Sequence, residues 1–130
     1  MDTDLKSARI LIVDDEPAIL MILEDVISDG LNCHIDTAEN GLAALELAKQ
    51  SKYNAICTDL KMPIMDGQGL IKALRESDGP NKDTGIIVIS AYAGNADQMI
   101  AQYDNILILD KPINEVRLVA NLKLIIGTNR

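Results

Sequence analysis

Aromatic residues are almost absent from this 130-residue chain, which contains three Tyr and neither Phe nor Trp. A hydrophobic core must therefore be built from Ile, Leu, Val, Ala and Met. Cysteine is nearly as scarce, since only Cys33 and Cys57 occur, both in apolar, strand-like runs. Two such residues provide no disulfide framework. We interpret them as small buried side chains in a protein of a reducing compartment.

Long apolar runs are also missing. No stretch approaches the ~18 apolar residues of a membrane span, and the amino-terminal residues M-D-T-D-L-K-S-A-R contain no apolar signal region. Basic residues are fewer than acidic ones, and the formal net charge is −8. Nucleic acids and anionic membranes are polyanions, so this charge disfavours both as direct partners. We expect a cytoplasmic protein with no direct nucleic-acid partner and no membrane partner.

The composition is that of an ordinary folded domain, with 48% hydrophobic and 25% charged residues. A chain of this length is large enough for one real core. No linker, repeat or low-complexity segment interrupts it. We expect one domain over residues 1–130, in which residues 1–8 are a flexible amino-terminal extension.

Five short apolar runs have the length of strands rather than helices. The first and fourth are apolar on both faces, as in strands covered on two sides, and the second is more polar, as at a sheet edge. The expected strands cover residues 9–13, 33–38, 55–58, 86–89 and 106–109.

Segments with helical spacing of apolar residues separate these runs. Expected helix starts are Pro17 and Gly67, Asn40-Gly41 is expected to end the second strand before the second helix, and Asn114 is expected to cap the last helix. A short, weak helix is expected over residues 96–102. The inner faces are expected to carry Ile19, Leu20, Leu23, Val26 and Ile27 in the first helix, Leu42, Leu45 and Ala48 in the second, Leu70, Ile71 and Leu74 in the third, Met99, Ile100 and Tyr103 in the fourth, and Val119, Leu122, Ile125 and Ile126 in the fifth.

Strands that alternate with helices predict a parallel sheet with right-handed crossovers and helices on both faces. The expected fold is therefore a three-layer α/β domain with a five-stranded parallel sheet. If the strand order is the flavodoxin-like 2-1-3-4-5, the first and third strands are adjacent and flank the crevice where such folds bind ligands.

Polar side chains end four of the five strands. Asp14 and Asp15 follow the first strand, Asp59 follows the third, Ser90 ends the fourth and Lys111 follows the fifth. The carboxyl ends of parallel strands lie at one edge of the sheet, so these groups are expected to share one pocket.

Three carboxylates in one pocket need a cation. Two unit charges ~4 Å apart repel by about 4 kcal/mol at an effective dielectric near 20. Oxygen ligands favour Mg²⁺, with Mn²⁺ as its substitute. With Lys111 and Ser90 nearby, the same groups suit phosphoryl transfer, in which Asp59 would be the nucleophile. Taken singly, Asp14 or Asp15 could be a helix cap, Ser90 a strand-end hydroxyl and Lys111 half of a surface ion pair with Asp110.

The combined pattern resembles the receiver domain of two-component response regulators. Its elements are D-D after the first strand, D-x-K-M-P-x-M-D-G from Asp59 to Gly67, S-A at Ser90 and K-P at Lys111. The resemblance spans essentially the whole chain. It implies a CheY-like fold and a phosphoprotein that takes a phosphoryl group from a histidine kinase or phosphotransfer protein, rather than an enzyme in the usual sense.

The resemblance also assigns roles to residues. It makes Asp59 the phosphoacceptor, contacted after transfer by Ser90 and Lys111. The metal ligands would be Asp14 through water, Asp15 and Asp59 directly, and the backbone carbonyl of Lys61. It further implies a cis Lys111–Pro112 bond, which proline makes affordable.

Three further positions matter in this family, because they influence dephosphorylation or transmit the phosphorylated state to partners. Here they carry Lys61, Tyr92 and Ile108. Lys61 and Tyr92 stand where side chains influence hydrolysis of the acyl phosphate. Ile108 replaces an aromatic that in the family changes rotamer with the Ser/Thr, so readout through the distal face is in question. Tyr92 or Tyr103 could substitute for that aromatic. His34, the only histidine, is interpreted as structural or exposed.

Two other functions stay open at this stage. The first is a receiver-like docking module with an idle pocket. The final helix carries more apolar residues than one face needs, so the 96–126 face could bind a second copy or an output partner. The second is an aspartyl-nucleophile phosphatase. That chemistry wants D-x-D, which neither Asp14 nor Asp59 begins.

Overall fold

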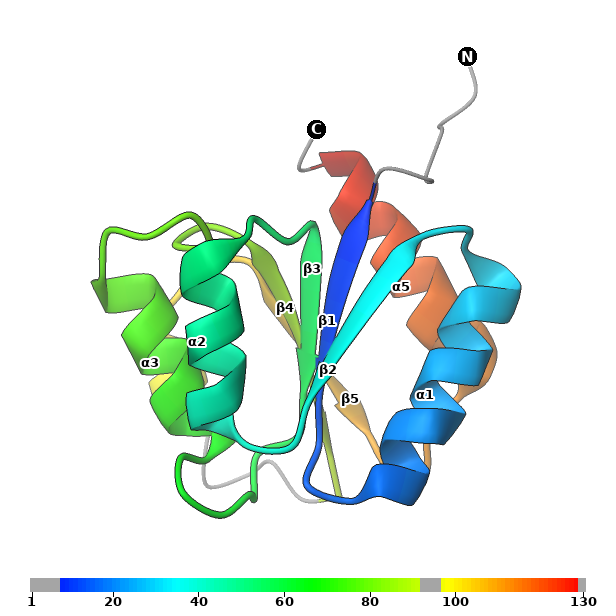
Figure 1. Ribbon diagram of the computed structural model, residues 1–130, viewed down its shortest axis with the longest axis horizontal. Helices are drawn as coiled ribbons and strands as arrows, with labels where there is room; N and C mark the ends of the chain where they lie inside the picture. Colours follow the sequence, from blue (N-terminus) through cyan, green and yellow to red (C-terminus); the bar gives the residue numbers. More distant parts are fainter. Residues whose placement is uncertain (1–7, 92–96, 129–130) are drawn as a thin grey trace.

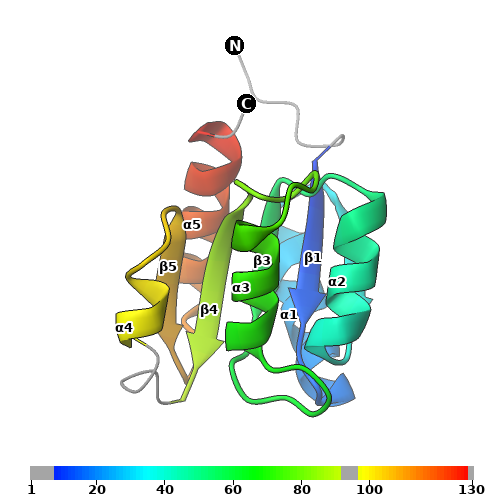
Figure 2. The ribbon, with the colours of Figure 1, turned by 90° about the vertical axis from the view of Figure 1, so that its left-hand side faces the viewer.

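The computed structural model describes residues 8–91 and 97–128. Strands and helices alternate along them (Figures 1 and 2). The strands are β1 Arg9–Val13, β2 His34–Ala38, β3 Ala55–Thr58, β4 Gly85–Ser90 and β5 Ile106–Asp110, and the helices are α1 Pro17–Gly30, α2 Gly41–Gln50, α3 Gly67–Glu76, α4 Asp97–Ile100 and α5 Glu115–Thr128. None of the helices within the described ranges is both long enough and apolar enough to cross a membrane.

All pairings among the described strands are parallel, in the order β2-β1-β3-β4-β5. This confirms the predicted strand order and places β1 beside β3. Val13, the last residue of β1, pairs with Thr58, the last residue of β3. The residues that follow these two strands, Asp14 and Asp59, therefore leave the sheet side by side.

Helices cover both faces of the sheet, which completes the predicted three layers (Figure 1). On one face, α1 and α5 pack on a cluster that includes Ile10, Ile12 and Cys57. On the other face, α2, α3 and α4 pack on Leu11, Ile56 and Val88. Strands β1, β3 and β4 are buried on both faces, as their apolar runs predict.

The first, third and fifth helices have the predicted inner faces, and α2 has its predicted face only in part, since Ala48 is buried and Leu45 packs on the core. Its buried residues are Gly41, Ala44 and Ala48, whereas Leu42, predicted to face the core, is 44% exposed. A Cβ on Gly41 would lie 2.5 Å from the Met65 carbonyl oxygen. The small residues thus let α2 pack closely on the loop before α3, and this contact turns Leu42 outward.

Other boundaries differ by a few residues. Helix α4 spans Asp97–Ile100 rather than 96–102, and β2 begins one residue after Cys33. Residues 1–7 lie outside the described part of the chain, but Ala8 is buried in the core and so does not belong to a flexible extension.

The two cysteines differ in burial, although both are free thiols. Cys57 is buried in the core as predicted, whereas Cys33 is only half-buried. Burial, with a smaller contribution from Cys33, raises the pKa of the Cys57 thiol to about 12. Cys57 is therefore an inert part of the core at neutral pH.

Candidate functional site

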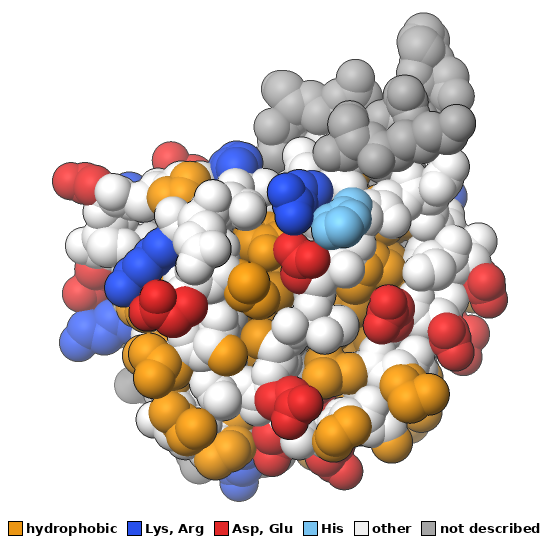
Figure 3. Space-filling model, viewed as in Figure 1, with side chains coloured by type: hydrophobic (Ala, Val, Ile, Leu, Met, Phe, Trp, Pro, Cys, Tyr) orange, Lys and Arg blue, Asp and Glu red, His pale blue; other side chains and the backbone are white. Residues whose placement is uncertain are grey.

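The carboxyl ends of the strands lie along the lower border of the sheet in Figures 1 and 2. Acidic side chains are scattered over the face seen in Figure 3, and apolar side chains gather toward its lower border. The loops after β1, β3 and β5 meet at this border. They carry the residues that the sequence predicts to share a pocket.

Asp14, Asp15 and Asp59 form a cluster in which one carboxylate oxygen of each lies within 4.8 Å of the others. Asp14 is 2% exposed, Asp59 is partly buried and Asp15 reaches solvent. Burial raises the pKa of Asp14, a hydrogen bond from the Glu16 amide opposes the rise, and the charge of Asp59 adds to it. The protein therefore holds a carboxylate where its charge is unfavourable.

Lys111 supplies the positive charge beside this cluster. Its Nζ lies 3.4 Å from Asp59 Oδ2 and 3.9 Å from Asp14 Oδ2. One ammonium offsets part of the repulsion among three carboxylates and leaves excess negative charge. Oxygen donors at this spacing fit a small, hard divalent cation such as Mg²⁺.

Backbone hydrogen bonds to neighbouring strands hold the two inner aspartates. The Asp14 amide donates to the Ala38 carbonyl at 3.1 Å, and the Asp59 amide donates to the Val13 carbonyl at 3.0 Å. Asp59 Oδ1 accepts from the Leu60 amide at 2.7 Å, and Asp14 Oδ1 accepts from the Glu16 amide at 3.0 Å. These contacts place both carboxylates before any ligand binds.

Ser90 lies at the same edge. It is buried at the end of β4, and its carbonyl accepts from the Lys111 amide at 3.0 Å. The Lys111–Pro112 peptide bond is cis, as predicted. Asp110 is exposed, as expected for a side chain that points away from the site.

The remaining residues predicted to act near the site are less completely placed. The Lys61 side chain is exposed in the β3–α3 loop, and Tyr92 lies outside the described residues. Ile108 is half-buried against the α2–α3 side of the core. Tyr103 is bound to α3 through a hydrogen bond from its hydroxyl to Glu76. His34 is exposed and bonds Asp36, in agreement with its interpretation.

Sequence reasoning missed two residues that hold the phosphoacceptor candidate. Thr58 was interpreted only as a strand end, yet its buried Oγ1 donates to the Asp59 carbonyl at 2.8 Å. Gly67 is predicted only as a turn residue and helix start, yet a Cβ there would lie 2.3 Å from that same carbonyl oxygen. The Asp-Gly pair signals a turn but does not reveal which backbone the glycine approaches.

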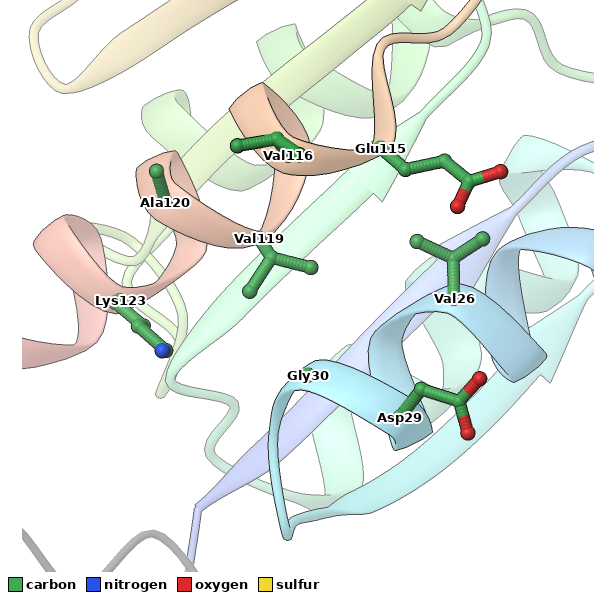
Figure 4. Close-up of a pocket in the computed structure, with 8 residues that line it drawn as sticks. All are labelled: Val26, Asp29, Gly30, Glu115, Val116, Val119, Ala120 and Lys123. Carbon is green, nitrogen blue, oxygen red and sulfur yellow. The ribbon is translucent and has the colours of Figure 1, made fainter.

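A hollow lies between α1 and α5, away from the acidic cluster (Figure 4). Val26 of α1 and Val119 of α5 form its apolar walls, and Asp29, Glu115 and Lys123 also line it. With a volume of about 420 Å³ it is larger than a single side chain. It lacks the convergent carboxylates, so it is not the candidate reaction site.

Comparisons with known proteins agree with this geometry. A model of the response regulator receiver domain matches residues 10–123. The transcriptional regulatory protein PrrA of Mycobacterium leprae is 34% identical over 132 residues, which cover 97% of this chain and 53% of PrrA. This chain spans about half the length of the curated relatives it matches first.

Solved structures show the same fold. A sensor protein from Polaromonas sp. JS666 has a TM-score of 0.82 and 31% identity, with 95% of this chain and 98% of that chain covered. The receiver domain of the sensor histidine kinase PA1611 from Pseudomonas aeruginosa, solved with magnesium in its active-site cleft, has a TM-score of 0.82 and 24% identity, with coverages of 93% and 98%. On the family match and the acidic cluster together, this chain belongs to the response regulator receiver domain family of two-component signalling.

Proposed function

We propose that this chain is a phosphorylation-switched receiver domain in which Asp59 accepts a phosphoryl group from the phosphohistidine of a histidine kinase or phosphotransfer protein. The observation that supports this most is the setting of Asp59. Its carboxylate lies within 4.8 Å of two other carboxylates and 3.4 Å from the Lys111 ammonium. The ammonium thus faces the position where phosphoryl oxygens would carry charge, and the three carboxylates offer ligands for a cation beside it.

A divalent cation completes the proposed site. Asp14, Asp15, Asp59 and the backbone carbonyl of Lys61 would hold Mg²⁺, with Mn²⁺ as the substitute, and Asp14 would act through water. When bound, the ion neutralises negative charge on the carboxylates and on the phosphoryl oxygens. Three oxygens from three carboxylates suit this hard ion better than a softer metal.

The transfer step assigns a task to each side chain. An Asp59 oxygen forms a bond to phosphorus as the P–N bond of phosphohistidine breaks, and the imidazole keeps that electron pair and takes up a proton. The product is an acyl phosphate on Asp59. Lys111 pairs with one phosphoryl oxygen, and the Ser90 hydroxyl donates a hydrogen bond to another.

Hydrolysis resets the site. Water attacks phosphorus, the acyl P–O bond breaks, and the Asp59 carboxylate is restored with release of inorganic phosphate. Lys61 and Tyr92 occupy the positions proposed to influence this step. The chain is thus a phosphoacceptor that is consumed and regenerated, rather than an enzyme that turns over a separate substrate, and we place its action in the cytoplasm.

The proposed output surface is the distal face over residues 96–126. Helix α5 leaves Val116 79% and Leu124 61% exposed, and Leu107 of β5 is also exposed. Apolar side chains in these positions suit contact with a second copy or an output partner. Ile108 offers no aromatic ring to rotate, so a signal there would travel by a shift of packed aliphatic side chains.

Labelling with a small phosphodonor tests the proposal. Acetyl phosphate with Mg²⁺ is expected to add one phosphoryl group to the wild type, measured by intact mass, and EDTA is expected to abolish the reaction. Asp59→Asn is expected to remain unlabelled. Asp110→Asn is the matched control, because Asp110 also ends a strand but is exposed and outside the cluster. An unlabelled wild type, or a labelled Asp59→Asn variant, would overturn the proposal.

A further inference from the structure

We infer that Thr58 is a positioning residue for phosphoryl transfer. It sets which oxygen of Asp59 is free to react. This inference rests on the proposed function of Asp59 and adds a residue to that site. It is carried by a chain of hydrogen bonds that runs from a buried hydroxyl through one peptide unit to the phosphoacceptor carboxylate.

The chain begins at the Thr58 hydroxyl, which is buried at the end of β3. Thr58 Oγ1 donates to the Asp59 carbonyl oxygen at 2.8 Å. That carbonyl belongs to the peptide unit that joins Asp59 to Leu60. The amide at the other end of the same unit donates to Asp59 Oδ1 at 2.7 Å. The hydroxyl and the carboxylate thus hold opposite ends of one planar unit.

Both bonds share this peptide unit, so they act together. A donor on the carbonyl polarises the peptide and strengthens the bond that its N–H makes. The donor also restrains rotation of the peptide plane, which would move the N–H away from Oδ1. Loss of the Thr58 hydroxyl is therefore expected to loosen the Asp59 carboxylate without removing any atom from the site.

Surrounding backbone restricts the same unit from the other sides. Gly67 approaches so closely that a Cβ would lie 2.3 Å from the Asp59 carbonyl oxygen and 2.9 Å from the Leu60 Cα. The Gly67 amide donates to the Leu60 carbonyl at 2.8 Å, and the Asp59 amide donates to Val13. These contacts fix the ends of the loop, and the Thr58 hydroxyl fixes the orientation of the peptide between them.

These contacts make the two carboxylate oxygens of Asp59 different from each other. Oδ1 is occupied by the Leu60 amide, whereas Oδ2 faces the Lys111 ammonium at 3.4 Å. Oδ2 is the oxygen beside the group that would neutralise an incoming phosphoryl oxygen. Thr58 thus orients Oδ2 for attack without touching the phosphoryl group.

The test compares Thr58→Val, which keeps the shape of the side chain but loses the hydroxyl, with Thr58→Ser, which keeps the hydroxyl. The control is Thr84→Val. Thr84 is equally buried, and its Oγ1 bonds the Tyr53 carbonyl and the Asn81 side chain, before β4 and away from the acidic cluster. Labelling by acetyl phosphate with Mg²⁺ is measured as a function of donor concentration, below the unfolding transition of every variant.

Thr58→Val is expected to lower the maximal labelling rate about five- to thirtyfold, because a small displacement of a reacting group is costly. The donor concentration for half-maximal rate is expected to change less than twofold. Thr58→Ser is expected to restore most of the rate. Thr84→Val is expected to lower the thermal unfolding midpoint at least as much as Thr58→Val does, with a labelling rate within twofold of the wild type.

Each outcome bears on the inference. A Thr58→Val variant that is labelled at the wild-type rate, or a Thr58→Ser variant as slow as Thr58→Val, would overturn the positioning role while Asp59 remains the phosphoacceptor. Equal slowing in Thr84→Val would show that lost stability accounts for the effect, which would also overturn it. An unlabelled wild type would instead overturn both the inference and the proposed function.

Discussion

Asp14 offers the most direct test of the electrostatic reasoning, because its charge is buried among like charges. We expect Asp14→Asn to make the metal-free protein more stable than the wild type. The substitution keeps the size of the side chain and an Oδ1 that can accept from the Glu16 amide. It removes the negative charge that Asp15 and Asp59 oppose.

The structure sets the scale of the effect. Oxygens within 4.8 Å at an effective dielectric near 20 repel by at least about 3.5 kcal/mol a pair, so two neighbours cost about 7 kcal/mol. The Lys111 ammonium, 3.9 Å from Asp14, offsets about 4 kcal/mol. Solvent around the exposed Asp15 reduces the remainder, so the expected gain is about 1–3 kcal/mol. For a domain of this size that is a rise of about 3–10 °C in the unfolding midpoint.

The assay is thermal and urea unfolding followed by circular dichroism, with EDTA and then with Mg²⁺. Asp25→Asn controls for the change in net charge, because Asp25 is an exposed acid on α1. Added Mg²⁺ is expected to stabilise the wild type more than Asp14→Asn, since ligands that bind only the folded state raise its stability. A variant no more stable than the wild type in EDTA would refute the account of the cluster.

Three further predictions concern the rest of the molecule. The hydrogen bond from Tyr53, more than the nearby charges, lowers the pKa of Asp36 below its unfolded value of about 3.9. The ionised Asp36 carboxylate therefore contributes stability above about pH 4, and this contribution is lost as pH falls through the folded pKa. The difference in unfolding free energy between wild type and Asp36→Asn, measured with urea, should narrow below about pH 4. A difference that stays constant with pH would contradict this. Asn81→Ala should lower the free energy of unfolding in urea by about 3 kcal/mol, because the buried side-chain amide bonds four partners. Labelling of the folded protein by acetyl phosphate should stay unchanged. A loss of less than about 1 kcal/mol would count against the importance of this hydrogen-bond network. Ile64→Gly should raise the free energy of unfolding by about 1 kcal/mol. Ile64 is 76% exposed and has φ of 70°, a conformation that is unfavourable for a β-branched residue. A lower urea midpoint in the variant would argue against backbone strain at this position.

The sequence alone predicts a parallel three-layer fold and the edge at which the polar residues lie, whereas the strand order 2-1-3-4-5 came from the flavodoxin-like fold and the family resemblance. This was achievable because apolar runs that alternate with helical segments leave few topologies, and parallel strands send their carboxyl ends to one edge. Asp14, Asp59 and Lys111 could thus be expected in one pocket from their positions after three strands. The cis bond at Pro112 followed from the resemblance to a known family, rather than from the local residues.

Tertiary structure decided which atoms meet within that pocket. The close approach of α3 to β3 brings Gly67 against the Asp59 peptide, whose carbonyl also accepts from the neighbouring Thr58 hydroxyl, and no spacing in the sequence encodes that approach.

The same holds for the faces of the helices. The periodicity of α2 predicts that Leu42 faces the core with Leu45 and Ala48, but close contact of Gly41 with the Met65 backbone leaves Leu42 44% exposed. Periodicity determines that a helix has an inner face, because one side must leave water. Which residues occupy that face depends on contacts between segments far apart in the chain.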